Sequence, residues 1–353
     1  MEICNIKELP SLYKDQLGDR LNFYKLIGVF DMIKRRPLKI YIHFMDFRIQ
    51  QIKNSMQTIN WYPGHMAKAR RMLEENVKLV DMIIEIVDAR APLACRNPDF
   101  EALFVNKLRV VVLNKSDLSS KTQNKAWIEY FRKQGITAVE LVSTNPSMRK
   151  NAVALIERTG AETVRRYKEK GINKTLRAMI VGVPNVGKST FINRIAGTAK
   201  AQVGDRPGVT KSKQWVKITD FLELMDTPGL LWGKLDNEIL AKHLAYIGSI
   251  RDDILDVEEL AALLLYDLMK ICPDQLIARY KKLTPEMNSP EELLDGVCRS
   301  RGFILSGGVL DTERAARIVL DEYRAGKIAA IALENPDDDF ASKPDEVTDH
   351  ADC

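Results

Sequence analysis

Residues 182–190 have the types and spacing of a phosphate-binding loop. They read Gly-Val-Pro-Asn-Val-Gly-Lys-Ser-Thr and satisfy G-x-x-x-x-G-K-[ST] between an apolar run and a helical run. Glycines let the backbone wrap around phosphates and point N–H groups at them. The lysine adds positive charge at the β- and γ-phosphates, and the serine hydroxyl of Ser189 can ligate Mg²⁺. The residues predicted to hold the phosphates are Val186, Gly187, Lys188, Ser189 and Thr190.

A second pattern, upstream of this loop, selects the base. Residues 114–117 read Asn-Lys-Ser-Asp at the end of an apolar run. An ionised Asp117 only accepts hydrogen bonds, so it can bind the ring N–H and the exocyclic amino group of guanine together, whereas adenine lacks this pair of donors. A later Ser-Thr pair stands where GTPases usually carry Ser-Ala, a partial match. The residues predicted to form the base pocket are Asn114, Lys115, Asp117, Ser143 and Thr144. We therefore expect GTP and GDP to bind.

A third pattern, Asp-Thr-Pro-Gly at residues 226–229, matches D-x-x-G. Asp226 is expected to reach Mg²⁺ through water, and the N–H of Gly229 to sense the γ-phosphate. Upstream of it, Thr210 is the candidate switch threonine that ligates Mg²⁺, with a plain turn as the alternative. Because D-x-x-G is common by chance, its position one strand pair after the phosphate loop is the evidence for its role.

Two leucines follow this glycine, where Ras-like proteins carry a glutamine that orients the attacking water. The side chains of Leu230 and Leu231 can neither position water by hydrogen bonding nor stabilise charge. We therefore expect slow hydrolysis of GTP unless another group replaces the glutamine.

Apolar runs alternate with amphipathic stretches, as in α/β proteins, and must position these motifs. Several runs are apolar at consecutive positions, which favours strands buried on both faces of a mainly parallel sheet. The expected strands are residues 82–87, 109–113, 138–142, 178–181, 214–218 and 222–225. Residues 238–333 read as helices. The predicted fold class is α/β: a P-loop GTPase domain with a mainly parallel sheet and flanking helices, followed by a small all-helical domain.

The guanine motif precedes the phosphate loop, which reverses the order of an ordinary small GTPase. The domain is therefore predicted to be circularly permuted, a change that is tolerated when the native ends lie close together. In this order the D-x-x-G switch leads directly into the helical part, so that a motion dependent on the γ-phosphate can pass to it.

Composition and pattern divide the chain into four segments. We expect residues 56–236 to form the permuted GTPase domain and residues 237–333 the helical domain, a candidate for binding RNA. Residues 334–353 carry one Lys and eight acids and are expected to be a disordered tail. Residues 1–55 have no sustained period and no assigned role. Met56 is expected to be the true start, with a genuine N-terminal extension as the alternative.

The composition excludes several classes of protein. The longest apolar stretch, around residues 260–268, is shorter than the roughly 20 residues of a membrane-spanning helix. Five cysteines without a C-x-x-C pair argue against a disulfide framework and a zinc site, and favour a reducing cytoplasm. The net charge is +5 among 353 residues, and the middle of the chain is more basic than its acidic end. This surplus suits an RNA partner or a solvated basic surface.

The phosphate loop, the inverted order and the run Trp-Tyr-Pro-Gly-His-Met-Ala-Lys-Ala at residues 61–69 together resemble the ribosome biogenesis GTPase A (RbgA/YlqF) family. The resemblance covers about residues 56–333. It implies a cytoplasmic factor that hydrolyses GTP and binds the large ribosomal subunit and its rRNA late in assembly. We expect a monomer with no DNA or membrane partner.

The resemblance also implies residues for hydrolysis. His65 is the favoured substitute for the missing glutamine, because a neutral imidazole can orient water; a structural role is the alternative. Asn185 stands where similar GTPases use asparagine to ligate K⁺ beside the phosphates, with a loop-stabilising role as the alternative. The predicted catalytic residues are His65, Asn185 and Lys188.

Two basic helices are candidates for rRNA contact, with a solvated face as the alternative. The last helix, from an Asp311 N-cap to near Gly326, can carry Arg314, Arg317 and Arg324 on one face, opposite an apolar stripe. The basic residues of the other segment are Arg158, Arg165, Arg166, Lys168, Lys170 and Lys174.

Two other functions fit the sequence. A nucleotide-gated RNA-binding switch with negligible turnover suits Leu230. A GTPase partner of an RNA-modification enzyme would need a separate catalytic centre, and no cysteine or cofactor motif marks one.

Overall fold

The computed structural model of the chain describes residues 71–96, 101–197, 215–227, 229 and 237–338. Several predictions concern residues outside this set, namely those on residues 1–55, Met56, residues 61–69 with His65, Thr210, Leu230 and Leu231. None of the described helices has both the length and the hydropathy needed to cross a membrane.

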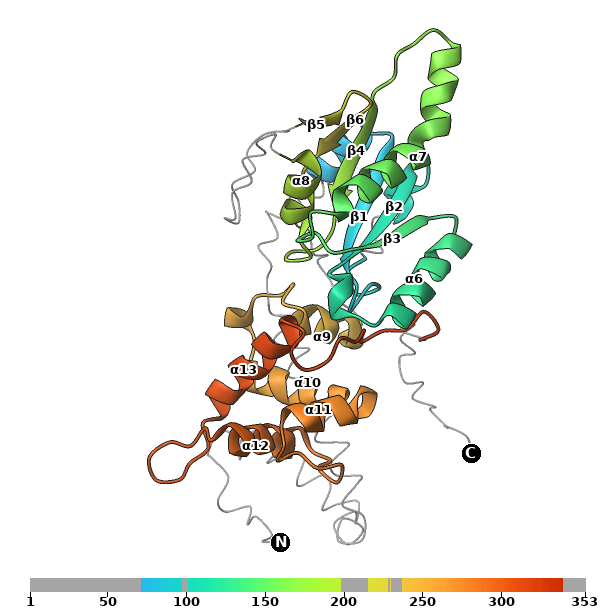
Figure 1. Cartoon of the computed structure of the whole chain (residues 1–353). Helices are drawn as coiled ribbons and strands as arrows, with labels where there is room; N and C mark the ends of the chain where they lie inside the picture. Colours follow the sequence, from blue (N-terminus) through green and yellow to red (C-terminus); the bar gives the residue numbers. More distant parts are fainter. Residues whose placement is uncertain (1–70, 97–100, 198–214, 228, 230–236, 339–353) are drawn as a thin grey trace, which may run out of the picture. The chain divides into compact units, whose positions relative to one another are not determined.

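Strands of one sheet follow the order β3-β2-β1-β4-β6-β5 (Figure 1). They are β1 (Met82–Asp88), β2 (Leu108–Asn114), β3 (Thr137–Leu141), β4 (Leu176–Val181), β5 (Trp215–Thr219) and β6 (Leu222–Met225). Neighbouring strands are parallel except β5, which pairs antiparallel with β6. The expected strands are present within two residues of their predicted bounds, and the mainly parallel α/β fold is confirmed.

The centre of the sheet is buried on both faces. Strand β1 is buried at every position, and β2 is buried from residue 110 to residue 114. Both strands lie between other strands, so their side chains meet helices rather than water, which explains why apolar residues follow one another directly. A core cluster on one face joins Ile83 of β1 and Met179 of β4 to Leu73 and Phe104.

Helices flank the strands of the α/β domain. They include residues 71–77, α5 (Glu101–Phe104), α6 (Lys121–Lys133), α7 (Met148–Glu169) and α8 (Lys188–Ala196). Helix α7 crosses one face of the sheet and contacts β2, β3 and β4, while α6 packs on β3 (Figure 1). Residues 71–77 and α5 contribute to the core cluster described above.

The helical domain is built around α10 (Val257–Ile271), which contacts its other α-helices. These are α9 (Glu238–Tyr246), α11 (Pro273–Arg279), α12 (Pro290–Arg301) and α13 (Thr312–Arg324), and the short 3-10 turn η4 (Asp252–Ile254) follows α9. At the N-terminus of α13, the Asp311 side chain accepts the N–H of Arg314, so the predicted N-cap is confirmed. The predicted all-helical character of this part is confirmed as well.

After α13 the chain returns to the α/β domain. Glu334 is fully buried, and its carboxylate accepts the N–H of Leu93 at 2.7 Å and contacts Nδ1 of His243 at 2.9 Å. Its carbonyl oxygen accepts a hydrogen bond from Nε1 of Trp127 at 3.2 Å. The predicted boundary of the acidic tail at residue 334 is therefore wrong, because composition does not reveal the buried N–H groups that hold this carboxylate. Residues 339–353 lie outside the described residues.

Candidate nucleotide-binding site

The phosphate loop joins β4 to α8 at the carboxyl end of the parallel strands, the edge at which α/β folds bind ligands. Gly187 has a φ of 95°, and a Cβ on it would lie 2.4 Å from Nδ2 of Asn114. Only glycine lets the loop approach the guanine motif this closely. Helix α8 begins at the next residue, so the positive end of its dipole faces the loop. In its first turn Ser189 is half-buried and Thr190 is exposed.

Lys188 lies under this loop and is only 8% exposed. Its Nζ donates to the carbonyl oxygen of Val183 at 2.8 Å. Asp226 favours the charged form of Lys188 by electrostatic attraction, but the two side chains form no ion pair in the part of the chain that the structure describes. Burial lowers the pKa of Lys188 to about 8, because a buried ammonium loses its hydration. The phosphates of a nucleotide would compensate this charge, which is the role that the sequence predicts.

Two residues of D-x-x-G, Asp226 and Gly229, lie near the same lysine. A Cβ on Gly229 would lie 2.9 Å from Nζ of Lys188 and 3.0 Å from Cα of Pro184. Oδ1 of Asp226 is buried and has no hydrogen-bond partner among the described residues. Burial raises the pKa of Asp226, while Lys188 opposes this shift. An orphaned buried carboxylate oxygen suits a cation, directly or through water, so this side chain fits the predicted Mg²⁺.

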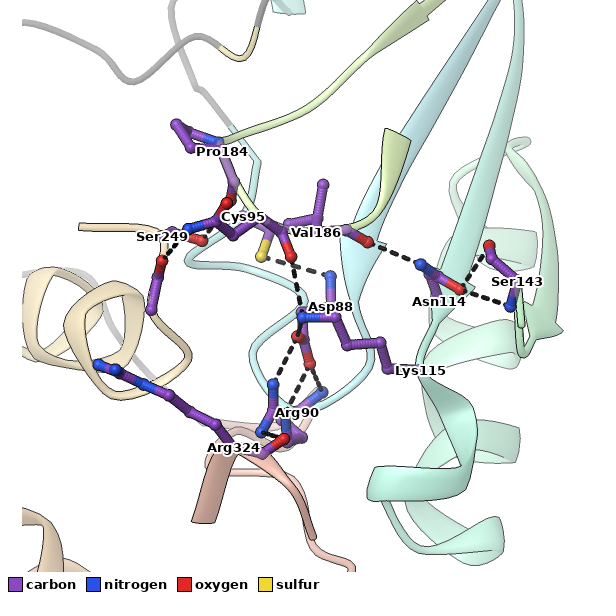
Figure 2. A network of polar contacts seen from close by, with 12 residues as sticks. Asp88, Arg90, Cys95, Asn114, Lys115, Ser143, Pro184, Val186, Ser249 and Arg324 are labelled. Atoms are coloured by element: carbon purple, nitrogen blue, oxygen red, sulfur yellow. Dashed lines mark hydrogen bonds and ion pairs between the residues drawn. The ribbon is translucent and has the colours of Figure 1, made fainter. Parts of the chain in front are cut away.

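Asn114, at the end of β2, joins three motifs (Figure 2). Its Nδ2 donates to the carbonyl oxygen of Val186 at 2.7 Å. Its Oδ1 accepts the N–H of Ser143 at 3.1 Å and the hydroxyl of the same serine at 2.8 Å. The side chain therefore ties the phosphate loop to the loop after β3. Its contact with the base stays a prediction.

The next residue, Lys115, bridges the base side and the phosphate side. Its φ is 57°, and its Nζ donates to the carbonyl oxygen of Asn185 at 2.9 Å and pairs with Oδ2 of Asp88 at 2.9 Å. Asp117 lies in the 3-10 turn η3 (Ser116–Leu118) and is exposed. An exposed carboxylate can accept hydrogen bonds from a ligand, and the contact of Asp117 with guanine stays a prediction.

Arg194 of α8 holds the loop that the Ser-Thr pair forms. It donates from Nε to the carbonyl oxygen of Ser143 at 3.0 Å and from Nη2 to that of Thr144 at 3.0 Å. Ser143 is buried and Thr144 is exposed. The two hydrogen bonds from Arg194 hold the backbone carbonyl groups of this pair in place. No pattern in the sequence indicated Arg194, because its partners lie about 50 residues away.

The phosphate loop also contacts the helical domain (Figure 2). Asn185 has a φ of 61°, and its Nδ2 donates to the carbonyl oxygen of Gly248 at 2.6 Å. The hydroxyl of Ser249 donates to the carbonyl oxygen of Pro184 at 2.8 Å. The predicted K⁺ ligand thus has its amide nitrogen bound to the helical domain, which leaves its carboxamide oxygen to act as an acceptor.

A buried ion pair that the sequence analysis missed lies beside the guanine motif (Figure 2). Asp88, at the end of β1, accepts hydrogen bonds from Nε of Arg90 at 2.9 Å and from Nη2 at 2.8 Å. Burial raises the pKa of Asp88, but Arg90 and Lys115 outweigh it and lower the pKa to about 2. A charged residue directly after the apolar run of a central parallel strand was the signal that could have found this pair.

The predicted rRNA-facing arginines differ in exposure. Arg324 binds Asp252 through two hydrogen bonds of 2.6 and 2.8 Å and also donates to the end of α9. Its predicted place on a free basic face is therefore wrong, because its charge is used inside the protein. Arg317 is exposed and pairs with Glu313 of its own helix. Arg165 of α7 is likewise exposed and paired within its helix.

Comparisons with known proteins find GTPase relatives of this chain. The model of the family described as "50S ribosome-binding GTPase" matches residues 177–290, which include the phosphate loop and D-x-x-G. Ribosome biogenesis GTPase A from Priestia megaterium is 42% identical over 281 residues, which cover 79% of this chain and 97% of that protein. The protein of the same name from Thermotoga maritima is 32% identical over 280 residues, which cover 79% of this chain and 95% of that protein.

Solved structures match as well. GNP-bound YlqF from T. maritima is 28% identical with a TM-score of 0.54, over 77% of this chain and 99% of that chain. A GDP-bound YlqF structure is 28% identical with a TM-score of 0.56, over 76% of this chain and 100% of that chain. The chain aligns with a relative over nearly that relative's whole length. Its guanine motif, phosphate loop and D-x-x-G glycine also lie at one edge of the sheet. The chain is a GTP hydrolase that belongs to the ribosome biogenesis GTPase A family.

Proposed function

We propose that this GTPase is a cytoplasmic assembly factor for the large ribosomal subunit. Its GTP-bound state docks on the immature subunit and the rRNA there, and hydrolysis of GTP permits release. The observation that supports this most is the meeting of Lys188 and Gly229 beside the guanine motif, in a chain that aligns with nearly all of relatives named for ribosome biogenesis.

In this proposal the protein's own groups position GTP for attack by water. Lys188 and the N–H groups at the start of α8 bind the phosphates, and Gly229 reports the γ-phosphate through its N–H. Ser189, Thr210 and Asp226 would hold Mg²⁺. When bound, that ion supplies positive charge beside the β- and γ-phosphates. His65 orients the attacking water, because Leu230 occupies the position at which Ras-like proteins carry a glutamine.

K⁺ is proposed as a second cation, held by the carboxamide oxygen of Asn185. The hydrogen bond from Nδ2 to Gly248 supports this role, since it fixes the orientation of the amide. Turnover in KCl is expected to exceed turnover in NaCl at equal ionic strength, and Asn185→Ala should remove the difference. Equal rates in the two salts would exclude the K⁺ site.

The rRNA-binding surface is proposed to include the second half of α7 and the residues after it. Lys168 and Lys170 are exposed there, and Arg158 lies on the same helix. Two acids of α7, Glu162 and Glu169, pair with Arg165 and Arg166 of the same helix, so the lysines carry most of the uncompensated charge. Binding to rRNA should then weaken steeply as salt is added, and Lys168→Ala with Lys170→Ala should reduce the slope.

The deciding experiment is phosphate release from GTP in KCl, with and without purified large ribosomal subunits. Strong stimulation by the subunits is expected, and His65→Ala should abolish it while GTP binding is kept. GTP-dependent binding to the subunits without stimulated release would instead support a nucleotide-gated switch with negligible turnover.

A further inference from the structure

A closed ring of polar contacts joins the phosphate loop, the end of β1 and the helical domain, and Figure 2 shows the part of it around Asp88 and the phosphate loop. On one side of the ring, Asn185 and Pro184 of the phosphate loop are bound to Gly248 and Ser249 at 2.6 and 2.8 Å. Gly248 and Ser249 lie in the turn after α9, beyond its C-cap residue Ile247. The phosphate loop therefore rests on a turn that belongs to the helical domain.

Arg324, the last residue of α13, holds this turn. Its Nε donates to the carbonyl oxygen of Tyr246 at 3.0 Å, and its Nη2 donates to that of Ala245 at 2.9 Å. Asp252 fixes the guanidinium by accepting from both terminal nitrogens. A Cβ on Gly248 would lie 3.2 Å from Nε of Arg324, so the guanidinium packs directly against the glycine whose carbonyl binds the phosphate loop.

The backbone of Arg324 reaches the nucleotide site by a second route. Its carbonyl oxygen accepts a hydrogen bond from Nη1 of Arg90 at 3.3 Å. Arg90 is 1% exposed and holds both carboxylate oxygens of Asp88. Asp88 pairs with Nζ of Lys115, which also donates to the carbonyl oxygen of Asn185 and so closes the ring.

We propose that Arg324 is a positioning residue for the guanine nucleotide, through which the helical domain becomes part of the nucleotide site. Its side chain sets the turn that supports the phosphate loop. Its carbonyl oxygen supports the Arg90–Asp88 pair that orients Lys115 of the guanine motif. Both routes start from one residue at the end of α13, so a displacement of this helix shifts the phosphate side and the base side together.

The coupling is reciprocal. If the placement of α13 changes the affinity for nucleotide, bound nucleotide must favour that placement by the same free energy. A partner that binds the helical domain can therefore change nucleotide affinity without touching the nucleotide. The proposal concerns nucleotide binding by the isolated protein, so its test is independent of whether ribosomal subunits stimulate hydrolysis.

The test measures the dissociation constant of a fluorescent GDP for the full-length protein and three variants. Arg324→Lys keeps the charge but loses the bidentate geometry, and Ser249→Ala removes the hydroxyl bond to Pro184. Each is expected to weaken GDP binding by about three- to tenfold, the range for one or two lost hydrogen bonds. The double variant should lose less than the product of the two single losses, because both act through the same turn.

Matched controls separate positioning from general destabilisation. Arg317→Lys changes an exposed arginine of the same helix, whose partner is on that helix, and should leave GDP affinity unchanged. Asp252→Asn loosens Arg324 without replacing it, whereas Asp253→Asn alters the neighbouring acid that pairs with exposed Arg251. Only the former should weaken GDP binding. This pair also serves if Arg324→Lys folds poorly.

Thermal melting of each variant shows whether a loss of affinity has another origin. A purely structural Arg324 would lower the melting temperature and leave the GDP affinity of the folded protein within twofold of the parent, which would overturn the proposal. Fully multiplicative losses in the double variant would also overturn it, because Arg324 and Ser249 would then act independently.

Discussion

Two buried cations lie at the carboxyl edge of the sheet, Arg90 after β1 and Lys188 at the start of α8. Arg90 is 1% exposed and binds both oxygens of Asp88. Lys188 is 8% exposed and donates to a backbone carbonyl oxygen. Burial opposes the charge of both. Asp88 nevertheless raises the pKa of Arg90 above its ordinary value, whereas the pKa of Lys188 falls to about 8.

We expect this difference to separate a charge that stabilises the fold from a charge that binds the nucleotide. A buried cation with a bidentate carboxylate is compensated within the fold and needs no ligand. A buried cation that meets only a carbonyl oxygen is compensated when an anion arrives. Arg90 and Lys188 lie at the same edge of the sheet and are both buried. We therefore expect the presence or absence of a carboxylate partner, rather than position, to distinguish their roles.

The largest expected effect tests the structural side of this comparison. Asp88→Ala leaves Arg90 buried without its carboxylate and should lower the free energy of unfolding by about 3–5 kcal/mol. Urea denaturation measures this loss. The added substitution Arg90→Met should recover much of it, and Asp253→Ala, which breaks an exposed pair, should have little effect. A loss as small as that of the control would mean that Arg90 does not depend on Asp88.

The functional side is tested by Lys188→Ala, which should weaken GTP binding by about 100-fold, because a charge-assisted contact with the phosphates is lost. Titration with a fluorescent GTP analogue measures the affinity. The free energy of unfolding without nucleotide should fall much less than in Asp88→Ala, since no buried partner loses its charge. Lys170→Ala, at an exposed lysine, is the control. An unchanged GTP affinity would remove Lys188 from the site.

A smaller effect follows from the pKa of Lys188. Phosphates stabilise its charged form, so GDP affinity should fall about tenfold between pH 7 and pH 9 as the free lysine, with a pKa of about 8, loses its proton. Arginine stays charged over this range, so Lys188→Arg should remove the part of the fall that Lys188 causes. Any pH dependence that comes from the guanine ring itself should remain. Without nucleotide, the effect of pH on folding stability has the opposite direction. Above pH 8 Lys188 binds fewer protons in the folded state than in the unfolded state, so its contribution to stability rises with pH. Identical profiles for parent and Lys188→Arg would contradict the assignment.

The smallest effect is expected for an exposed cation. Arg165→Ala breaks pairs with Glu162 and Glu169 on α7, whose side chains are largely exposed. It should leave the free energy of unfolding almost unchanged, because exposed pairs gain little over hydration. Urea denaturation at low and high salt checks this. A loss near that of Asp88→Ala would show that burial does not govern these charges.

The sequence predicts the parts of the fold that depend on local pattern. The consecutive valines of β2 identify a central strand, Asp311 identifies the start of α13, and the spacing of Gly182, Gly187 and Lys188 identifies the phosphate loop. Each signal lies within a few residues of the structure it specifies, so it survives without knowledge of the tertiary fold.

The remaining parts of the site depend on contacts between distant residues. Arg324 lies on a helix with other arginines, and only the packing of α13 against α9 distinguishes it from exposed Arg317. Ser249 and Gly248 carry no motif, yet they hold the phosphate loop from 60 residues or more away. Glu334 reads as the first acid of a tail because its partners are N–H groups near residue 93.

The return of the chain after α13 has a mechanical consequence. The helical domain is joined to the GTPase domain once by the covalent chain that follows the D-x-x-G switch. It is joined again where Leu333 donates its N–H to the carbonyl oxygen of Arg90 at 2.7 Å and Glu334 binds Leu93. The helical domain also meets the phosphate loop through Gly248 and Ser249. Attachment at several separate places restrains this domain from swinging as a hinged arm, so force applied to it reaches the phosphate loop and the Arg90 segment together.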